Sequence, residues 1–440
     1  MPNVPQPTRP VPLIPTRIPL GRAHMLASSA IREAERVGLP AHSITPLGGL
    51  RRFAPDIGDV SLLAIAPAQE HTNLLTGFAR LPASAAILSR SLAHVTIGNE
   101  RGAITLYVVI PEEAGSALVW HTGSVGHTSQ LQERAHRMGL SFDNGRLLDR
   151  KGQSVVTDTE ERLYEQLGLP GIPPELREGG DEIPAAERGD LPTLVSTPDI
   201  RGDLHMHSTW SDGRDTIAQM VFASQRLGYE YVAITDHSER SLASRQLAAK
   251  DIARQRADLE RVRSRNRNLE ILHGIEVDIM PDGSLDFDDE HLERFDIVLA
   301  SLHDHAGHDG ALLTDRYLRA IRHPLVNVIT HPANRTPARS RGYDLDFDAL
   351  FAAAAETGTA MEVDGAPGHL DLDGALARRA VAAGVMLVID SDCHRSDGLA
   401  RQMRFGVGTA RRGWIEPAHV LNTRSIDEVR AFIARKRARQ

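Results

Sequence analysis

Apolar stretches of strand length recur after about residue 201 and alternate with stretches of helical character. Seven of them read GDLHMH, YVAITDH, ILHGIEVDI, DIVLASLH, VNVITHP, AMEVDG and VMLVIDSDCH. Strands that alternate with helices are typical of an α/β fold with a parallel sheet. Almost every one of these strands finishes with His, Asp or Glu. Because strand ends meet on one rim of an α/β barrel, a barrel would gather these residues into one site.

The first half of the chain has a less regular pattern. Residues 1–20 are rich in proline, which predicts an extended or disordered segment. The stretch from 171 to 196 reads as a loop, and we place the boundary between the two halves in it, near Pro192. Between these segments the apolar spacing predicts helices at 21–38 and 131–138, strands at 60–66 and 104–110, and a strand followed by a helix at 154–168.

The composition is that of an ordinary globular protein, with 440 residues, 41% of them hydrophobic, and a formal net charge of −8. This charge gives the whole molecule no attraction to nucleic acid, although it does not exclude a local basic groove. The single cysteine, Cys393, excludes an intrachain disulfide. No signal peptide is recognisable, and no apolar run approaches the ~20 residues that a membrane span needs. We interpret the protein as soluble and cytoplasmic, with no membrane partner and an oligomeric state that the sequence does not indicate.

Nine side chains at or near the strand ends have the chemistry of metal ligands. They are His205, His207, Asp212, His237, Glu276, His303, His331, Asp392 and His394. Residues two apart on a strand point to the same face, so His205 faces the same way as His207. Imidazoles and carboxylates are the ligands of catalytic zinc, manganese or iron. Nine ligands exceed the need of one ion, so we predict two or three divalent cations.

Each of these residues also has a structural interpretation, because a lone strand-end histidine is more often hydrogen-bonded in a core or on a surface. Repetition of the pattern over six strands favours the metal interpretation for the set. It is least supported for Asp212, whose context SDGRD also suits a loop with a helix cap. Other histidines of this half, among them His305, His308 and His369, have no comparable support.

Further side chains near the strand ends could serve the same site. Candidates to orient the ligands are Asp236, Asp304 and Asp390, and Glu362 is the candidate for an extra carboxylate ligand. Arg335 and Arg339, which follow the fifth strand, are the candidates for binding a phosphate. Cys393 lies between two proposed ligands on a strand, so its side chain should point away from the metals.

A cluster of divalent cations predicts hydrolysis of a phosphoester. Such ions lower the pKa of bound water and neutralise the charge that builds on a phosphoryl group. We assign the catalytic role to His205, His207, Glu276 and Asp392. No Ser/His/Asp triad or nucleophilic cysteine context is apparent in the sequence.

The motifs DLHMHSTWSDG, ITDHS, GIEVDI, SLH, THP and SDCH resemble the PHP (polymerase and histidinol phosphatase) domain. GYEYVAITDHS, GSLDF and ARRGW resemble the form of it found in bacterial family X DNA polymerases. The resemblance covers about residues 200–423. It implies a distorted (β/α)7 barrel with a multinuclear site, usually of manganese or zinc, that hydrolyses phosphodiesters, often as a 3′-to-5′ exonuclease. The chain departs from the family at Asp390, Cys393 and His369, where Asn, Ala and Arg are common, and the last departure would weaken a phosphate contact.

The first half resembles a reduced palm of the same polymerases, an α+β nucleotidyltransferase-like domain, through IPLGRA, LGGLRR, IGDVSLL, TGSVGH and LGLPGIPPELREG. The polymerase metals need three carboxylates. Asp59 is kept, but Ser61 and Thr105 stand at the other two positions, and Gly49 replaces a serine. Neutral hydroxyls cannot assemble a two-magnesium site. We therefore predict that this half does not polymerise DNA, and we expect the chain to lack the family's N-terminal DNA-binding helices.

The predicted organisation has four segments. They are an extended N-terminus at 1–20, a degenerate palm region at 21–190, a PHP phosphoesterase domain at 191–425 and a basic C-terminal helix at 426–440. The basic residues of that helix are Arg435, Lys436, Arg437 and Arg439. We interpret them as a solvated helix end, which positive charge stabilises, and not as a nucleic-acid contact.

Three functions fit this sequence. The favoured one is a nuclease that acts on DNA ends, because the nearest resemblance is to the PHP domain that is linked to a polymerase. The second is a small-molecule phosphomonoesterase of the histidinol-phosphatase type, and the third is a non-catalytic DNA-binding protein. The filled metal set argues against the third, so DNA or another phosphoester is the expected partner.

Overall fold

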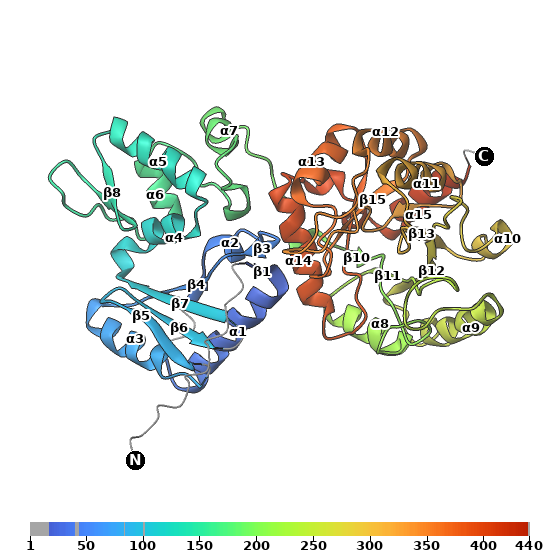
Figure 1. Cartoon of the computed structure of the whole chain (residues 1–440), viewed down its shortest axis with the longest axis horizontal. Coiled ribbons are helices and arrows are strands. Elements are labelled where there is room, and N and C mark those ends of the chain that lie inside the picture. Colours follow the sequence, from blue (N-terminus) through green and yellow to red (C-terminus); the bar gives the residue numbers. More distant parts are fainter. Residues whose placement is uncertain (1–16, 40–43, 83, 100–101, 439–440) are drawn as a thin grey trace, which may run out of the picture. The chain divides into compact units, whose positions relative to one another are not determined.

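The computed structural model describes residues 17–39, 44–82, 84–99 and 102–438. The chain divides into two compact units, Met1–Leu191 and Pro192–Gln440, which Figure 1 shows in blue to green and in green to red. None of the helices within the described ranges is both long and apolar enough to cross a membrane. The expectation for residues 1–16 lies outside the described residues.

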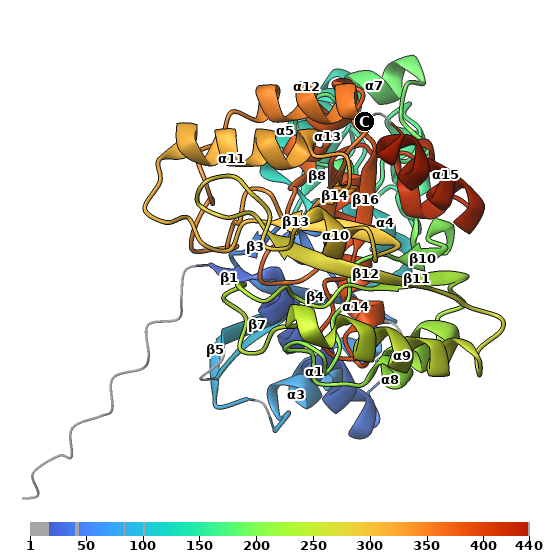
Figure 2. The same cartoon turned by 90° about the vertical axis from the view of Figure 1, so that its right-hand side faces the viewer.

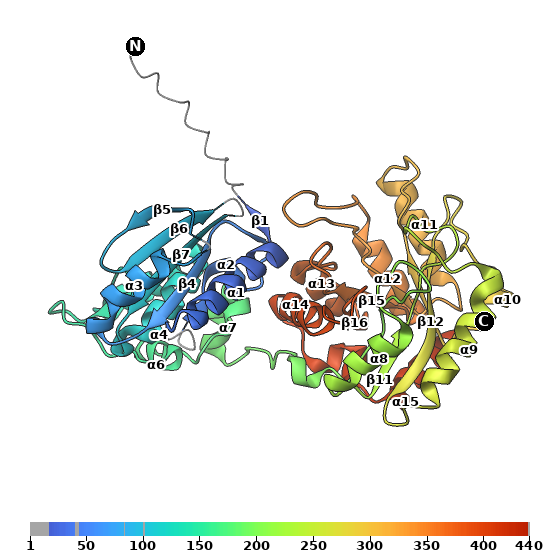
Figure 3. The same ribbon diagram turned by 90° about the horizontal axis from the view of Figure 1, so that it is seen from below.

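The first unit is built on a five-stranded sheet. Its strand order is β2 (Ile44–Pro46), β4 (Val60–Ile65), β7 (Gly102–Val109), β6 (His94–Asn99) and β5 (Ala86–Arg90). β4 runs parallel to β7, and the other neighbours are antiparallel. The helices α1 (Leu20–Arg36) and α3 (His71–Ala79) pack against these strands (Figure 3). The predicted helix at 21–38 and the predicted strands at 60–66 and 104–110 are confirmed.

Two short strands and a short helix complete this part of the unit. β1 (Ile18–Pro19) pairs with β3 (Asp56–Ile57), and α2 (Gly48–Arg51) lies between β2 and β3 in the chain.

The rest of the first unit is mainly helical. It contains α4 (Ala114–Thr122), α5 (Val125–Arg137), the hairpin β8 (Ser141–Asp143) with β9 (Arg146–Leu148), α6 (Glu160–Gln166) and α7 (Glu182–Arg188). The predicted strand at the start of 154–168 is wrong, because Ser154 forms only a single bridge to Leu148. The reading of 171–196 as a loop is also incomplete, since it contains α7. Pro184 lies in the first turn of that helix, where the missing N–H costs nothing, so the proline did not mark a break.

The second unit is an all-parallel sheet of seven strands in sequence order. They are β10 (Gly202–Asp203), β11 (Tyr231–Ile234), β12 (Glu270–Asp278), β13 (Ile297–Ser301), β14 (Val328–Ile329), β15 (Ala360–Asp364) and β16 (Leu387–Asp390). Just beyond the two edge strands, Met206 pairs with Cys393, and His207 N–H donates to Cys393 O at 3.0 Å. The sheet is therefore nearly closed into the distorted barrel that the sequence predicted.

Helices surround this sheet, as Figure 2 shows from the side of the second unit. They are α8 (Ile217–Arg226), α9 (Ile252–Arg263), α10 (Asp289–Leu292), α11 (Gly310–Arg322), α12 (Phe347–Thr357), α13 (Gly374–Ala382), α14 (Leu399–Arg412) and α15 (Ile426–Arg437).

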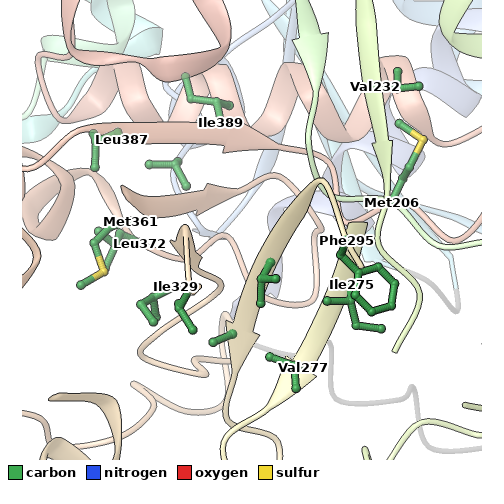
Figure 4. Packing of buried hydrophobic residues seen from close by; sticks show 14 of the residues in the cluster. Met206, Val232, Ile275, Val277, Phe295, Ile329, Met361, Leu372, Leu387 and Ile389 are labelled. Carbon is green, nitrogen blue, oxygen red and sulfur yellow. The ribbon is translucent and has the colours of Figure 1, made fainter. Parts of the chain in front are cut away.

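The strands bury both faces, and alternate residues belong to different apolar clusters. Val232, Ile275 and Ile389 belong to the layer shared with the surrounding helices (Figure 4). Their neighbours face the barrel interior, where Tyr231 packs in a cluster that includes Phe432 of α15. This alternation follows from the two-residue period of a strand.

The interior face changes from apolar to polar toward the carboxyl end of each strand. On β12 the apolar Leu272 is followed, two and four residues later on the same face, by Gly274 and Glu276. On β15 the small apolar Ala360 is followed in the same way by Glu362 and Asp364. The barrel interior is thus apolar at one end and polar at the carboxyl ends of the strands. The residues that form these layers are spaced two apart in the sequence, as strand geometry requires.

The basic tail corrects one expectation. Lys436 is buried, and its Nζ donates to Ile321 O at 2.6 Å and to Thr359 Oγ1 at 2.8 Å. Arg437 is half-buried and donates to Phe295 O at 2.8 Å. The end of α15 is therefore not a purely solvated helix end, because Lys436 and Arg437 satisfy carbonyls of the barrel. Arg439 lies outside the described residues.

Candidate metal centre

The predicted ligands gather at the carboxyl ends of the barrel strands. Eight of the nine fall into three overlapping groups whose ligand atoms lie within 4.8 Å of one another. The groups are His205–His207–Asp392, His237–Glu276–His303, and His207–Asp212–His237–His394. The ninth, His331, directs Nε2 at Glu276 Oε1 at 3.0 Å. The structure therefore brings together all nine residues, and their role as ligands stays a prediction.

The first group is compact and buried. His205 Nε2 lies 3.1 Å from His207 Nε2, and His207 Nε2 lies 3.1 Å from Asp392 Oδ1. Glu276 Oε2 is 3.4 Å from His205 Nε2 and 3.5 Å from His207 Nε2. Ligand atoms around one tetrahedral cation at the usual bond length lie roughly 3.4 Å apart. The spacing of these four side chains fits a shared cation.

The two oxygens of Glu276 face different ligands. Oε2 faces His205, His207 and His237, whereas Oε1 faces His331 and, at 3.8 Å, Nε2 of His303. A carboxylate in this position can bridge two cations. Glu276 is thus the residue that links two parts of the site.

One contact tests directly whether these residues suit a metal. His237 Nδ1 and Glu276 Oε2 are 2.8 Å apart, yet neither atom has a hydrogen-bond partner. Buried polar atoms that approach so closely without hydrogen bonding are costly unless a third group satisfies both. A cation is such a group, and an imidazole with a carboxylate is a donor set that divalent transition metals accept.

Asp212, the least supported of the predicted ligands, lies in the outer group. Its Oδ1 is 3.1 Å from His394 Nε2 and 3.6 Å from His237 Nε2. The ring of His207 stacks on both histidines, with centroids 4.3 Å from His237 and 4.2 Å from His394. The loop that carries Asp212 is held by Asp236, which accepts hydrogen bonds from Ser208 and Ser211.

The charges of the site are balanced within it. Burial would raise the pKa of Glu276, but the charges of His237 and His205 hold it well below its usual range. Burial lowers the pKa of His207 to about 3, helped by His394 and His237, so this ring is neutral. Burial opposes protonation of His394, yet Asp212 and Asp392 raise its pKa to about 9. A cation that binds must displace such protons, since ligands have to be deprotonated.

Other carboxylates fix the orientation of the histidines. Glu362 Oε1 accepts a hydrogen bond from His205 Nδ1 at 2.7 Å, so it orients a ligand and is not placed as one. Asp278 lies 3.1 Å from His303 Nδ1 and has the same relation to that ring. Asp278 was not among the predicted residues, although it stands two residues after Glu276 on the same face of β12.

Two of the proposed orienting residues behave differently from each other. Asp390 Oδ1 accepts from Leu204 N at 2.7 Å and so ties β16 to the segment before His205. Asp304 is exposed and accepts from Ala306 N within its own loop. The proposed role of Asp304 in orienting ligands has no support among the described contacts, because its carboxylate turns into the loop.

Two predicted ligands are among the described non-glycine residues with a positive φ. His331 has φ of 28° and Asp392 has φ of 47°, in the region that non-glycine residues rarely adopt. Such conformations cost about 1–3 kcal/mol each and persist where surrounding contacts impose them. Both residues follow the end of a strand, at the point where the chain turns over the site.

The remaining predicted residues lie at the edge of this arrangement. Arg335 donates to Asp373 Oδ2 at 2.9 Å and is mostly buried, whereas Arg339 is exposed. Their role in phosphate binding stays a prediction. Cys393 Sγ donates to Arg395 O and Gln402 Oε1 and packs in the outer apolar layer, so it does point away from the ligands.

The first unit brings together the residues that replace the polymerase carboxylates. Ser61 on β4 pairs directly with Thr105 on β7. Ser61 Oγ donates to Asp59 Oδ2 at 2.5 Å, and Thr105 Oγ1 lies 3.0 Å from Thr96 Oγ1. Asp59 is the one carboxylate among these three positions.

Comparison with known proteins supports both units. Residues 117–178 match the DNA polymerase beta thumb family, a division that the sequence analysis did not make, and residues 203–328 match the PHP domain family. A probable phosphatase of Syntrophotalea carbinolica is 31% identical over 39% of this chain and 68% of its own length. A probable phosphatase of Thermoanaerobacter sp. is 27% identical over 53% of this chain and 95% of its own.

A longer relative aligns through both units. The DNA polymerase/3′-5′ exonuclease PolX of Bacillus subtilis is 34% identical over 429 residues, which cover 96% of this chain and 74% of that protein. Together with the PHP match and the ligand clusters of the barrel, this alignment places the chain in the bacterial PolX family as a metal-dependent phosphoesterase.

Proposed function

We propose that the barrel hydrolyses phosphodiester bonds at DNA ends, as a 3′-to-5′ exonuclease or a related DNA-repair phosphoesterase, and that the chain does not polymerise DNA. The observation that carries this proposal is the alignment with PolX, a named 3′-5′ exonuclease, over both units. The match of residues 117–178 to a polymerase thumb supports DNA as the substrate, since the phosphatase relatives align only in part.

We assign two or three divalent cations, Mn²⁺ or Zn²⁺ with Fe²⁺ as a further candidate, to the clustered ligands. His205, His207, Glu276 and Asp392 would hold the inner one, and the group around Asp212 would hold a second. Bound there, the cations would supply a hydroxide nucleophile and offset charge on the phosphoryl group. The protein itself would set the protonation of the ligands, and Glu362 and Asp278 would fix the rings of His205 and His303.

Loss of polymerisation is proposed from the palm positions. A nucleotidyl-transfer site needs several carboxylates to hold its magnesium ions, and here the hydroxyls of Ser61 and Thr105 flank a single carboxylate, Asp59. Hydroxyls add no charge to balance a dication. We therefore expect no template-directed nucleotide addition.

A small-molecule phosphatase is the second candidate, because the probable phosphatases align with 39% and 53% of the chain. A non-catalytic DNA-binding role is less consistent with nine retained ligand-type side chains. The experiment that separates these functions compares a 5′-labelled duplex with a recessed 3′ end and a phosphomonoester such as p-nitrophenyl phosphate, each with Mn²⁺.

The variants for this experiment are His205→Ala and, as a matched control, His291→Ala, a partly exposed histidine of α10 paired with Asp288. Stepwise shortening of the labelled strand by wild type and His291→Ala, with a loss of at least about 100-fold in His205→Ala, is expected. Intact DNA with released phosphate would favour the phosphatase. Shortening that survives in His205→Ala, or addition of nucleotides with Mg²⁺, would contradict the proposal.

A further inference from the structure

A fourth group of ligand-type side chains lies beside the predicted set. Asp364, His369 and Asp392 each offer one ligand atom, and these atoms lie within 4.8 Å of one another. Asp392 also belongs to the group with His205 and His207, whereas Asp364 and His369 were not among the predicted ligands. Asp364 lies two residues after Glu362 on β15, so both side chains face the barrel interior.

The chain after β15 folds back to deliver His369. Asp364 N–H donates to Asp371 O at 2.6 Å, and His369 N–H donates to Ala366 O at 3.0 Å. The ring of His369 stacks on that of His331, with centroids 5.0 Å apart and an interplanar angle of 21°. A predicted ligand just after β14 thus packs directly against His369.

Asp364 is buried in a way that leaves one oxygen without a partner. Its side chain is fully buried, Oδ1 accepts from Ala366 N, and Oδ2 has no hydrogen-bond partner. Nδ1 of His369 is likewise buried and has no hydrogen-bond partner. A carboxyl group in such surroundings is costly unless positive charge accompanies it.

We infer that Asp364, His369 and Asp392 hold an additional divalent transition-metal cation, with Asp392 shared between it and the cation at His205 and His207. Two carboxylates and one imidazole are a donor set that Mn²⁺ and Zn²⁺ accept. A shared carboxylate places the two ions next to each other, as in other sites where neighbouring cations act on one phosphoryl group. The inference rests on the proposed function in that it extends the same metal centre.

The test measures metal content instead of activity. The full chain is loaded with excess Mn²⁺ and desalted, and the bound metal per chain is measured. Wild type is compared with Asp364→Asn, with His369→Gln and with the control His136→Gln, which lies at an exposed position on α5. Asp364→Asn and His369→Gln should each bind about one ion fewer than wild type, and His136→Gln should bind the same number. His369→Cys should favour Cd²⁺ over Mn²⁺ more than wild type does, because thiolate prefers softer ions.

The outcomes separate this inference from the proposed function. Unchanged metal content in both Asp364→Asn and His369→Gln would overturn the additional site. If the KM of His369→Gln rose while its metal content stayed the same, His369 would be a substrate contact and not a metal ligand. A wild-type chain that binds no metal would instead contradict the proposed function. Circular dichroism melting of each variant identifies any loss of metal that follows from misfolding, and the His369→Cys preference then decides the question.

Discussion

Glu362 accepts a hydrogen bond from Nδ1 of His205 at 2.7 Å, and Nε2 of the same ring consequently faces His207 and Asp392. The second oxygen of Glu362 accepts from the backbone N–H of His331 at 2.8 Å. One buried carboxylate on β15 therefore orients one predicted ligand by its ring and holds a second by its backbone. Such contacts set both the ring tautomer and the basicity of a ligating histidine.

We predict that Glu362→Gln weakens metal binding about 10- to 100-fold. Glutamine keeps the size of the side chain and one acceptor, but it removes the negative charge that raises the basicity of His205. Calorimetric titration with Mn²⁺ measures the change. Glu270→Gln, at the exposed start of β12, is the control and should leave the Kd unchanged. An unaltered Kd in Glu362→Gln would show that the hydrogen bond is only structural.

Metal affinity should rise with pH through the neutral range. The pKa values of His394 and His331 are raised to about 9, despite burial, by Asp212 and by Glu276 respectively. Both rings therefore carry protons at pH 7.5 that a cation has to displace, and this competition weakens as the pH rises toward about 9. Calorimetry in buffers of different ionisation enthalpy should show proton release on Mn²⁺ binding, smaller by about one proton in His394→Gln. Affinity that stays flat between pH 6.5 and pH 9 is the contrary result.

Glu160→Gln should destabilise the first unit by about 3–5 kcal/mol. Glu160 pairs with Arg51 and with the buried Arg177, each at 2.7 Å, so the change leaves Arg177 as a buried cation without its carboxylate. Hydrogen–deuterium exchange of peptides from residues 114–190 in the full chain reports this locally. Glu161→Gln, at the exposed neighbouring position, should change exchange little.

The same ion pairs predict how acid affects this unit. Burial opposes ionisation of Glu160, but Arg51 and Arg177 lower its pKa to about 2 from the ordinary value of 4.5. Its folded-state pKa is depressed, so its contribution to stability is present above pH 4.5 and is lost as the pH falls toward about 2. The exchange rates of wild type should rise over that window. A Glu160→Gln chain, which has no such group, should show a smaller rise.

Lys436→Ala should cost about 1.5–3 kcal/mol, because the buried ammonium group donates to Ile321 O and Thr359 Oγ1. Arg435→Ala, an exposed position of the same helix, should be nearly neutral and serves as the control. Urea unfolding of the full chain, followed at the tryptophans of the second unit, measures both. Equal effects of the two substitutions would mean that the tail acts only through its charge.

Much of the barrel follows from local sequence pattern. Each of the seven strands was recognisable from its apolar run and its polar end, because a strand buried on both faces has few places for a charged side chain other than its end. The two-residue period also showed that His205 and His207 share a face. The same reasoning applied one step further along β12 and β15 would have found Asp278 and Asp364, which lie two residues beyond Glu276 and Glu362.

Other features were outside the reach of local pattern. The helix α7 begins after two glycines and carries Pro184 in its first turn. Glycine and proline are typical of turns, so the local sequence predicted a loop there. The burial of Lys436 depends on Ile321 and Thr359, which lie far away in the chain and reveal nothing in the sequence of α15. A basic residue at a helix end is expected to be solvated, and only the tertiary structure shows whether acceptors from distant segments lie close enough to bind it.

The sequence by itself determined which side chains lie at strand ends and which of them share a face, because strand periodicity is a property of neighbouring residues. Only the tertiary structure decided which faces meet. The pairing of Met206 with Cys393 nearly closes the sheet and brings His207 within 3.1 Å of Asp392. Glu362 became a partner of His205 through the same closure, whereas Asp364 and His369 meet Asp392 through the packing of the neighbouring strands β15 and β16. Contacts between residues so distant in the chain depend on the whole packing of the barrel, which no local pattern encodes.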